Sequence, residues 1–206
     1  MRHPARTSRR SVPGRIRTLL AAFVLVATVL PAEFVPVAQA AGPTLAAGFT
    51  DEILASGLNH PSAIAFTSNG RVFVAEQRGV VKTWPSYAAL VADQAPAVAL
   101  DIQGQVNSYW DRGLLGLAVD PDWPVQPYIY VLYTYDAVPG GSPPRWNDLC
   151  PGSPGPGSTT DGCVASGRID RVQMDTTSGI ATGSTTHLIT DYCQQFPSHS
   201  VGTLVF

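Results

Sequence analysis

Three groups of residues in this 206-residue chain have side chains that could do chemistry. His199 lies between two serines, directly before the apolar run 201–206. Imidazole titrates near neutral pH and suits a general base, although the residue type alone favours a solvated loop histidine. Asp120 and Asp122 flank a proline. We interpret them as turn residues and assign no metal ligand, because calcium takes about six to eight oxygen ligands from several positions.

The three cysteines form the third group. Cys150 and Cys163 bracket a stretch rich in proline and glycine, and we expect them to form a disulfide that closes this short loop. Cys193 is left over, which predicts a partner outside these 206 residues. The remaining histidines receive no role: His60 is expected at a turn, and His187 is expected to be partly exposed in a strand.

The N-terminus has the profile of a signal peptide. Six arginines and no acid precede residue 18, an apolar run covers 19–30, and the Ala-Gln-Ala sequence at 38–40 fits a cleavage site. The run is too short to span roughly 30 Å of hydrocarbon, so we expect cleavage after Ala40, a secreted or extracytoplasmic protein, and no stable membrane span after cleavage. The arginine pair at 9–10 leaves the Sec and twin-arginine routes open.

Charge excludes one class of partner. Without residues 1–40 the chain keeps seven basic and 14 acidic residues, a formal charge of −7. An acidic surface with one lysine, Lys82, offers no footprint for phosphates, so no nucleic-acid partner is expected.

Short strands separated by turns must position these residues. Residues 69–70 are Asn-Gly, a strong hairpin signal between the expected strands 61–66 and 71–76. A single helical turn is expected at 87–91. The nearly continuous apolar runs 114–119 and 128–135 predict central strands buried on both faces, in which the tyrosines pack the sheet. Further strands are expected at the following ranges: 80–84, 95–104, 167–174, 186–190 and 201–206.

No long amphipathic helix follows residue 41, so the fold class is all-β, either a sandwich or a propeller. The strand lengths and a loose echo between 63–74 and 115–133 favour a propeller. The expected organisation is a signal peptide (1–40), a lead-in (41–52) and a β domain (53–206) with a disulfide-bearing insertion at 137–167.

Several segments resemble the soluble PQQ-dependent glucose/sorbosone dehydrogenases, which are six-bladed β-propellers. The resemblance rests on Gly57–Pro61 with the hairpin 63–76, on the Gly-Leu-Leu-Gly segment with Asp-Pro-Asp at 112–122, and on the tail 198–206. The cysteine insertion and residues 193–196 are similar to secreted actinobacterial-type members. Because several blades of the family have no counterpart here, we expect an N-terminal fragment of roughly a third to half of the domain.

The resemblance implies a function and two site residues. His199 would be the general base that takes the sugar C1 hydroxyl proton as hydride passes to PQQ. Asp111, two residues before the glycine of the Gly-Leu-Leu-Gly segment, would face the substrate or cofactor, where it could orient the histidine or bind a sugar hydroxyl; a solvent-facing turn is the alternative. PQQ and calcium would be the cofactors, with most ligands beyond Phe206, and an external electron acceptor would be the partner.

Two other functions remain open. A non-catalytic extracellular propeller that binds glycans or proteins is compatible with the fold, since fold does not fix function, and Asp111 stands where better-known members can have an amide. A lactonase-type propeller would need a ring of carboxylates around a metal, and these residues show no such set.

Overall fold

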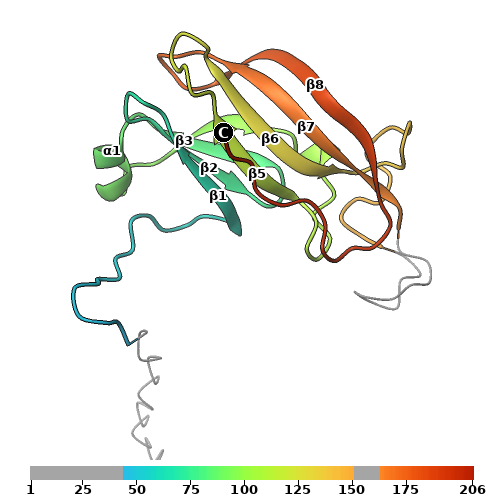
Figure 1. Cartoon of the computed structure of the whole chain (residues 1–206), viewed down its shortest axis with the longest axis horizontal. Helices are drawn as coiled ribbons and strands as arrows, with labels where there is room; N and C mark the ends of the chain where they lie inside the picture. Colours follow the sequence, from blue (N-terminus) through green and yellow to red (C-terminus); the bar gives the residue numbers. More distant parts are fainter. Residues whose placement is uncertain (1–43, 151–162) are drawn as a thin grey trace, which may run out of the picture. The chain divides into compact units, whose positions relative to one another are not determined.

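Two four-stranded antiparallel sheets form the computed structural model, which describes residues 44–150 and 163–206. Strands neighbouring in sequence are neighbours in each sheet, in the orders β1-β2-β3-β4 and β5-β6-β7-β8 (Figure 1). The first sheet contains β1 (Pro61–Phe66), β2 (Val72–Glu76), β3 (Val80–Trp84) and β4 (Ala97–Asp101). The second contains β5 (Leu114–Val119), β6 (Tyr128–Tyr135), β7 (Ala165–Met174) and β8 (Ala181–Gln194). The all-β prediction is confirmed.

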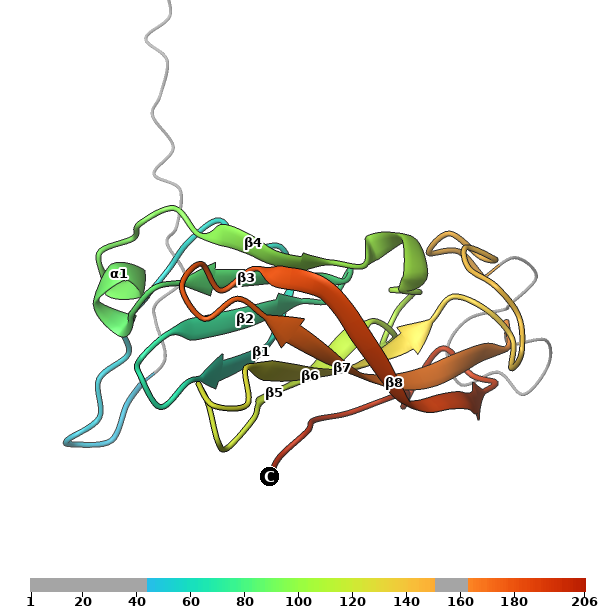
Figure 2. The same ribbon diagram turned by 90° about the horizontal axis from the view of Figure 1, so that it is seen from above.

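Local sequence explains the first sheet. At the Asn-Gly turn the Thr67 N–H donates to Arg71 O, and Gly70 has a φ of 89°, which glycine adopts without a steric cost. Helix α1 (Tyr87–Val91) follows β3 and begins at Ser86, whose hydroxyl accepts from the Ala89 N–H. Figure 2 shows α1 beside the end of β3. A 3-10 turn, η1 (Gln103–Gln105), follows β4 where a longer strand had been predicted.

The main core lies between the sheets. It combines Phe73 and Val81 of the first sheet with Leu117, Ile129 and Val131 of the second, all between 0% and 4% exposed. Burying such side chains contributes about 1.5–3 kcal/mol each. A smaller cluster on the other face of the first sheet, beneath α1, contains Val72, Val74, Trp84, Ala89 and Leu90.

Three sequence predictions about strands need correction. Residues 114–119 form a strand, but β5 is the edge of its sheet and not a central strand. The strand predicted at 186–190 is longer, because β8 pairs with β7 from Ala181 to Gln194 through several register shifts. Residues 201–206 form no strand.

The tail 201–206 packs on side chains instead of pairing with a strand. Phe206 lies edge-on against Tyr130 at a centroid distance of 5.0 Å. A Cβ at Gly116 would be 2.8 Å from Gly202 O, so the glycine of the predicted Gly-Leu-Leu-Gly segment permits this close approach. The apolar composition of the tail predicted a strand that does not form, because a strand also requires a hydrogen-bonding partner.

Candidate active site

A tight turn before β5 carries Asp111. The Arg112 N–H donates to Tyr109 O at 3.1 Å, which places Trp110 and Asp111 at the tip of the turn. Trp110 has a φ of 56°, in the left-handed region that bulky residues rarely adopt. Both tip residues are exposed, whereas Arg112 is fully buried.

Gln77, in the turn between β2 and β3, holds this turn from the first sheet. Its Nε2 donates to Trp110 O at 2.6 Å and to Arg112 O at 2.8 Å, and its own carbonyl accepts from the Leu114 N–H. Gly113 has a φ of 140°, and a Cβ there would be 2.5 Å from Gln77 O. This contact gives a physical reason for glycine at position 113.

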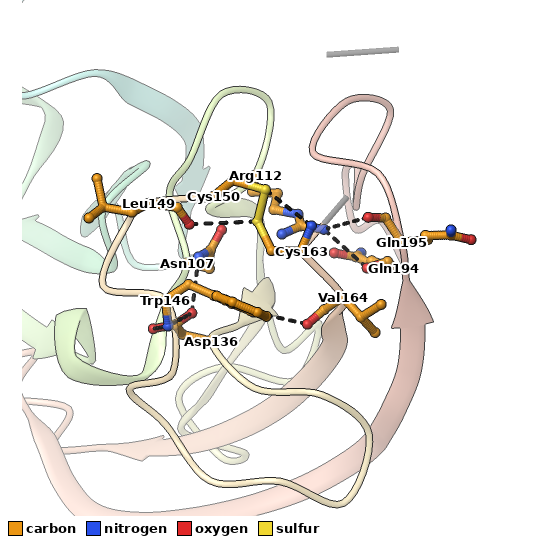
Figure 3. The surroundings of a disulfide bond; sticks show 10 residues. All are labelled: Asn107, Arg112, Asp136, Trp146, Leu149, Cys150, Cys163, Val164, Gln194 and Gln195. Atoms are coloured by element: carbon orange, nitrogen blue, oxygen red, sulfur yellow. Dashed lines mark hydrogen bonds between the residues drawn. A yellow bond between two sulfur atoms is a disulfide. The ribbon is translucent and has the colours of Figure 1, made fainter. Parts of the chain in front are cut away.

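Arg112 joins the turn to the end of β8. Its Nη2 donates to Gln194 O at 3.0 Å and to Gln195 O at 3.4 Å, as Figure 3 shows. Burial lowers the pKa of Arg112 to about 10, and the nearby Asp136 carboxylate opposes this shift. The guanidinium therefore fixes the chain four residues before His199.

His199 meets Asp111 through its backbone. The His199 N–H donates to Asp111 Oδ2 at 3.3 Å, and His199 has a φ of 54°. Within the part of the chain that the structure describes, the imidazole ring is exposed and has no hydrogen-bond partner. The two predicted site residues lie together, with the carboxylate holding the loop of the histidine and not its ring.

Gln77 and Arg112 were not among the predicted site residues. Nothing in the local sequence marks Gln77, and the partners of Arg112 are 82 and 83 residues away. The only available signal for Arg112 was its position between Asp111 and Gly113.

The disulfide-bearing segment reaches the same region. Cys150 and Cys163 are bonded, as predicted.

The buried Asp136 carboxylate accepts backbone N–H groups of Arg145, Trp146 and Asn147. Asp148 Oδ1 accepts from the Ser108 N–H at 2.7 Å, directly before the Asp111 turn. The segment thus supports the turn through Ser108 (Figure 3 shows the surroundings of the disulfide).

A second polar cluster lies in the second sheet. Buried Asp170 accepts from the Tyr133 hydroxyl at 2.8 Å and lies 2.7 Å from His187 Nδ1. Burial and the neighbouring Asp170 raise the pKa of Tyr133 well above its usual range. His187 is half exposed, as predicted, and this cluster braces β6, β7 and β8.

The other residues considered in the sequence analysis lie in turns or at exposed positions. Asp120 Oδ1 accepts from the Asp122 N–H, and its Oδ2 accepts from the Tyr130 hydroxyl, so this pair forms the predicted turn. His60 O accepts from the Gln77 N–H. Cys193 is exposed and is not disulfide-bonded within the described residues. Across 44–150 and 163–206, no group of three or more His, Cys, Asp or Glu residues is placed to hold a metal ion.

These sheets have the four-stranded meander of propeller blades. Residues 58–150 match the family model described as Glucose / Sorbosone dehydrogenase. Residues 58–150 are therefore similar to the glucose/sorbosone dehydrogenase family. A comparison with curated proteins found no match.

Several solved structures are similar to this chain over part of its length. The PQQ-bound aldose sugar dehydrogenase of Streptomyces coelicolor is 16% identical, with a TM-score of 0.45 over 68% of this chain and 32% of that one. The soluble aldose sugar dehydrogenase of Escherichia coli, in its apo form, is 17% identical, with a TM-score of 0.43 and the same coverages. An oxidoreductase of Thermus thermophilus, described as a glucose dehydrogenase, is 21% identical, with a TM-score of 0.41 over 63% and 29%. The chain spans about a third of the length of these structures.

Proposed function

We propose that the chain supplies the general base of an exported PQQ-dependent sugar dehydrogenase, with His199 as that base. The observation that carries the proposal is the contact between His199 and Asp111, which holds an exposed imidazole with no partner among the described residues. The match of residues 58–150 to the Glucose / Sorbosone dehydrogenase model supports the substrate class.

The proposed chemistry follows from the histidine. A neutral imidazole takes the proton of the C1 hydroxyl of an aldose, while the C1 hydrogen leaves as hydride. PQQ would supply the hydride acceptor when bound, with an external electron acceptor as the proposed partner. Asp111 keeps the histidine loop in place through the His199 N–H, and its exposed carboxylate is the proposed partner of a sugar hydroxyl.

The described residues do not fit a calcium site, because no carboxylate cluster is present in them. We therefore derive no step through the metal. Arg112, the cationic residue next to Asp111, is fully buried and is not exposed to pair with the acidic groups of the quinone.

Export is part of the same proposal. The predicted signal peptide, residues 1–40, lies outside the described residues. The disulfide supports an oxidising compartment. No helix in the described ranges is long and apolar enough to cross a membrane.

The test first reads the genomic DNA downstream of the Phe206 codon in all three frames and then expresses the chain together with any continuation that encodes further blades. The expressed protein, supplied with PQQ and calcium, should oxidise an aldose with a dye acceptor. His199→Asn should lower kcat by about 10²–10⁴-fold. His60→Asn is the matched control, because His60 is also exposed and has a φ of 52°. Full turnover in His199→Asn, or no turnover in the parent protein, would contradict the proposal.

The non-catalytic propeller is the alternative outcome. It would bind sugars or proteins without oxidising them.

Residues 41–206 alone should show no turnover, because two sheets leave the apolar side chains of Leu188, Ile189 and Tyr192 exposed and enclose no cofactor.

A further inference from the structure

Trp110 is placed unlike the buried tryptophans of this chain. It is 56% exposed, whereas Trp84 and Trp123 are 2% and 3% exposed. Its φ of 56° is strained for a bulky residue, and glycine or asparagine adopts this conformation more easily. Strained residues concentrate at functional sites when the surrounding structure holds them in place.

The surrounding structure does hold Trp110. Gln77 donates to its carbonyl at 2.6 Å, and the Arg112 N–H closes the turn onto Tyr109. The next residue is Asp111, whose carboxylate accepts from the His199 N–H. Consecutive Cα atoms are about 3.8 Å apart, so the indole is presented from the same fixed turn that holds the loop of the proposed base.

We propose that Trp110 is a stacking platform for the sugar ring and contributes to substrate specificity. This inference rests on the proposed function. The indole offers a large apolar face with negative electrostatic potential. A pyranose whose axial hydrogens share one side presents a matching face of C–H bonds. An aldose stacked there would lie on the turn that also carries Asp111, whose carboxylate accepts from the His199 N–H.

Two features separate Trp110 from other exposed aromatic residues. Single exposed apolar side chains are ordinary on protein surfaces, and Tyr87, 49% exposed on helix α1, is one of them. Tyr87 is not among the residues in left-handed conformation and does not adjoin a candidate site. Trp110 combines strain, exposure and the neighbouring base, and a residue placed only for stability would have no reason to combine them.

The test follows the indole N–H signal of Trp110 by NMR in the purified chain during titration with D-glucose, D-galactose and D-xylose. Trp110→Phe identifies the signal by its loss and keeps an aromatic face. Trp110→Gly removes the ring and accepts the left-handed backbone. Tyr87→Ala is the control for an exposed aromatic residue. Sugar affinity in the variants is measured from chemical-shift changes at the Asp111 and His199 amides.

The expected results are a sugar-dependent shift of the Trp110 signal and unchanged binding in Tyr87→Ala. Trp110→Gly should weaken binding about tenfold and Trp110→Phe less. Trp110→Gly should also melt at the same temperature as the parent chain or higher, whereas a structural tryptophan would lower it.

Either of two binding results would overturn the inference: no shift of the Trp110 signal with any of the aldoses, or unchanged sugar affinity in Trp110→Gly. Neither result depends on PQQ. If a longer chain that continues past Phe206 binds sugar at Trp110 but transfers no hydride, this inference stands and the proposed dehydrogenase function fails. If turnover needs His199 but is unchanged in Trp110→Gly, the proposed dehydrogenase function stands and this inference fails.

Discussion

The carboxylate of Asp111 holds the backbone of His199, with 3.3 Å between Oδ2 and the amide nitrogen. One residue later, Arg112 holds the carbonyls of Gln194 and Gln195. Two consecutive residues thus fasten both ends of the five-residue segment 195–199. The position of the imidazole depends on both attachments, and the predictions below test each one.

Removing the Asp111 carboxylate should loosen the histidine loop. In Asp111→Ala, amide hydrogen exchange at His199 should become several-fold faster, because the N–H loses its acceptor. Asp111→Asn keeps a carbonyl oxygen in the side chain and should have a smaller effect. Asp122→Ala, at another exposed aspartate, serves as the control. Unchanged exchange at His199 in Asp111→Ala would mean that the contact does not hold the loop in solution.

Arg112→Met should destabilise the protein by about 1–3 kcal/mol, because two carbonyls at the end of β8 lose their buried donor. Chemical denaturation measures this change in the free energy of unfolding, and amide exchange at Gln195 and His199 should accelerate as well. Arg78→Met is the comparison, since Arg78 forms an exposed ion pair with Asp148 and should change stability by less than about 1 kcal/mol. Equal losses in the two variants would contradict the role given to Arg112.

Tyr133 makes the fold sensitive to alkaline pH. Its pKa is raised in the folded protein, so its contribution is fully present below the unfolded pKa of about 10 and is lost as pH rises above that value. The wild type should lose about 1.4 kcal/mol per pH unit from this residue above pH 10.

Tyr133→Phe isolates this effect. Near pH 8 the variant should be less stable by about 1.5–3 kcal/mol, because the bond to Asp170 is lost. The gap should narrow above pH 10, as followed by urea denaturation at each pH. Tyr87→Phe, at an exposed tyrosine, corrects for the general alkaline response. A gap that stays constant from pH 8 to 11 would show that the Tyr133 pKa is not raised.

The fold was predictable from the sequence wherever the signal was local. The Asn69-Gly70 turn and the helical turn at 87–91 need only neighbouring residues, and both are present. The tail 201–206 has the composition of a strand and forms none, since no local pattern states whether a strand partner exists. The edge position of β5 was missed for the same reason.

The candidate site was likewise predictable only in part. His199 and Asp111 were found through resemblance to a family, and the structure brings them together. The supporting contacts of Gln77 and Arg112 connect distant parts of the chain, and their side chains are common types with no distinctive local pattern. The exposed residues Asp111 and His199 were predicted from the sequence. The buried Arg112, which fixes their positions, is recognised only in the three-dimensional structure.

Breaking the disulfide should weaken the support of the Asp111 turn. Replacing Cys150 and Cys163 by serine removes a cross-link across 13 positions, for a loss of about 3 kcal/mol on loop-entropy grounds. Thermal unfolding measures the loss, and faster amide exchange at Ser108 should accompany it, because Asp148 holds that amide. Cys193→Ser is the control. If amide exchange at Ser108 in the double variant is the same as in the parent protein, the disulfide does not support the Asp111 turn.

The contacts that Asp111 and Arg112 make with residues 194–199 join positions 82 to 88 residues apart, whereas each sheet pairs only strands that follow one another. Closing a long loop costs entropy before the contact is gained, and such pairings form slowly. Both sheets can therefore fold early, and the Asp111–His199 contact is among the last to form. During synthesis, a nascent chain that has reached Gln194 holds every strand of both sheets and nothing yet of its proposed base.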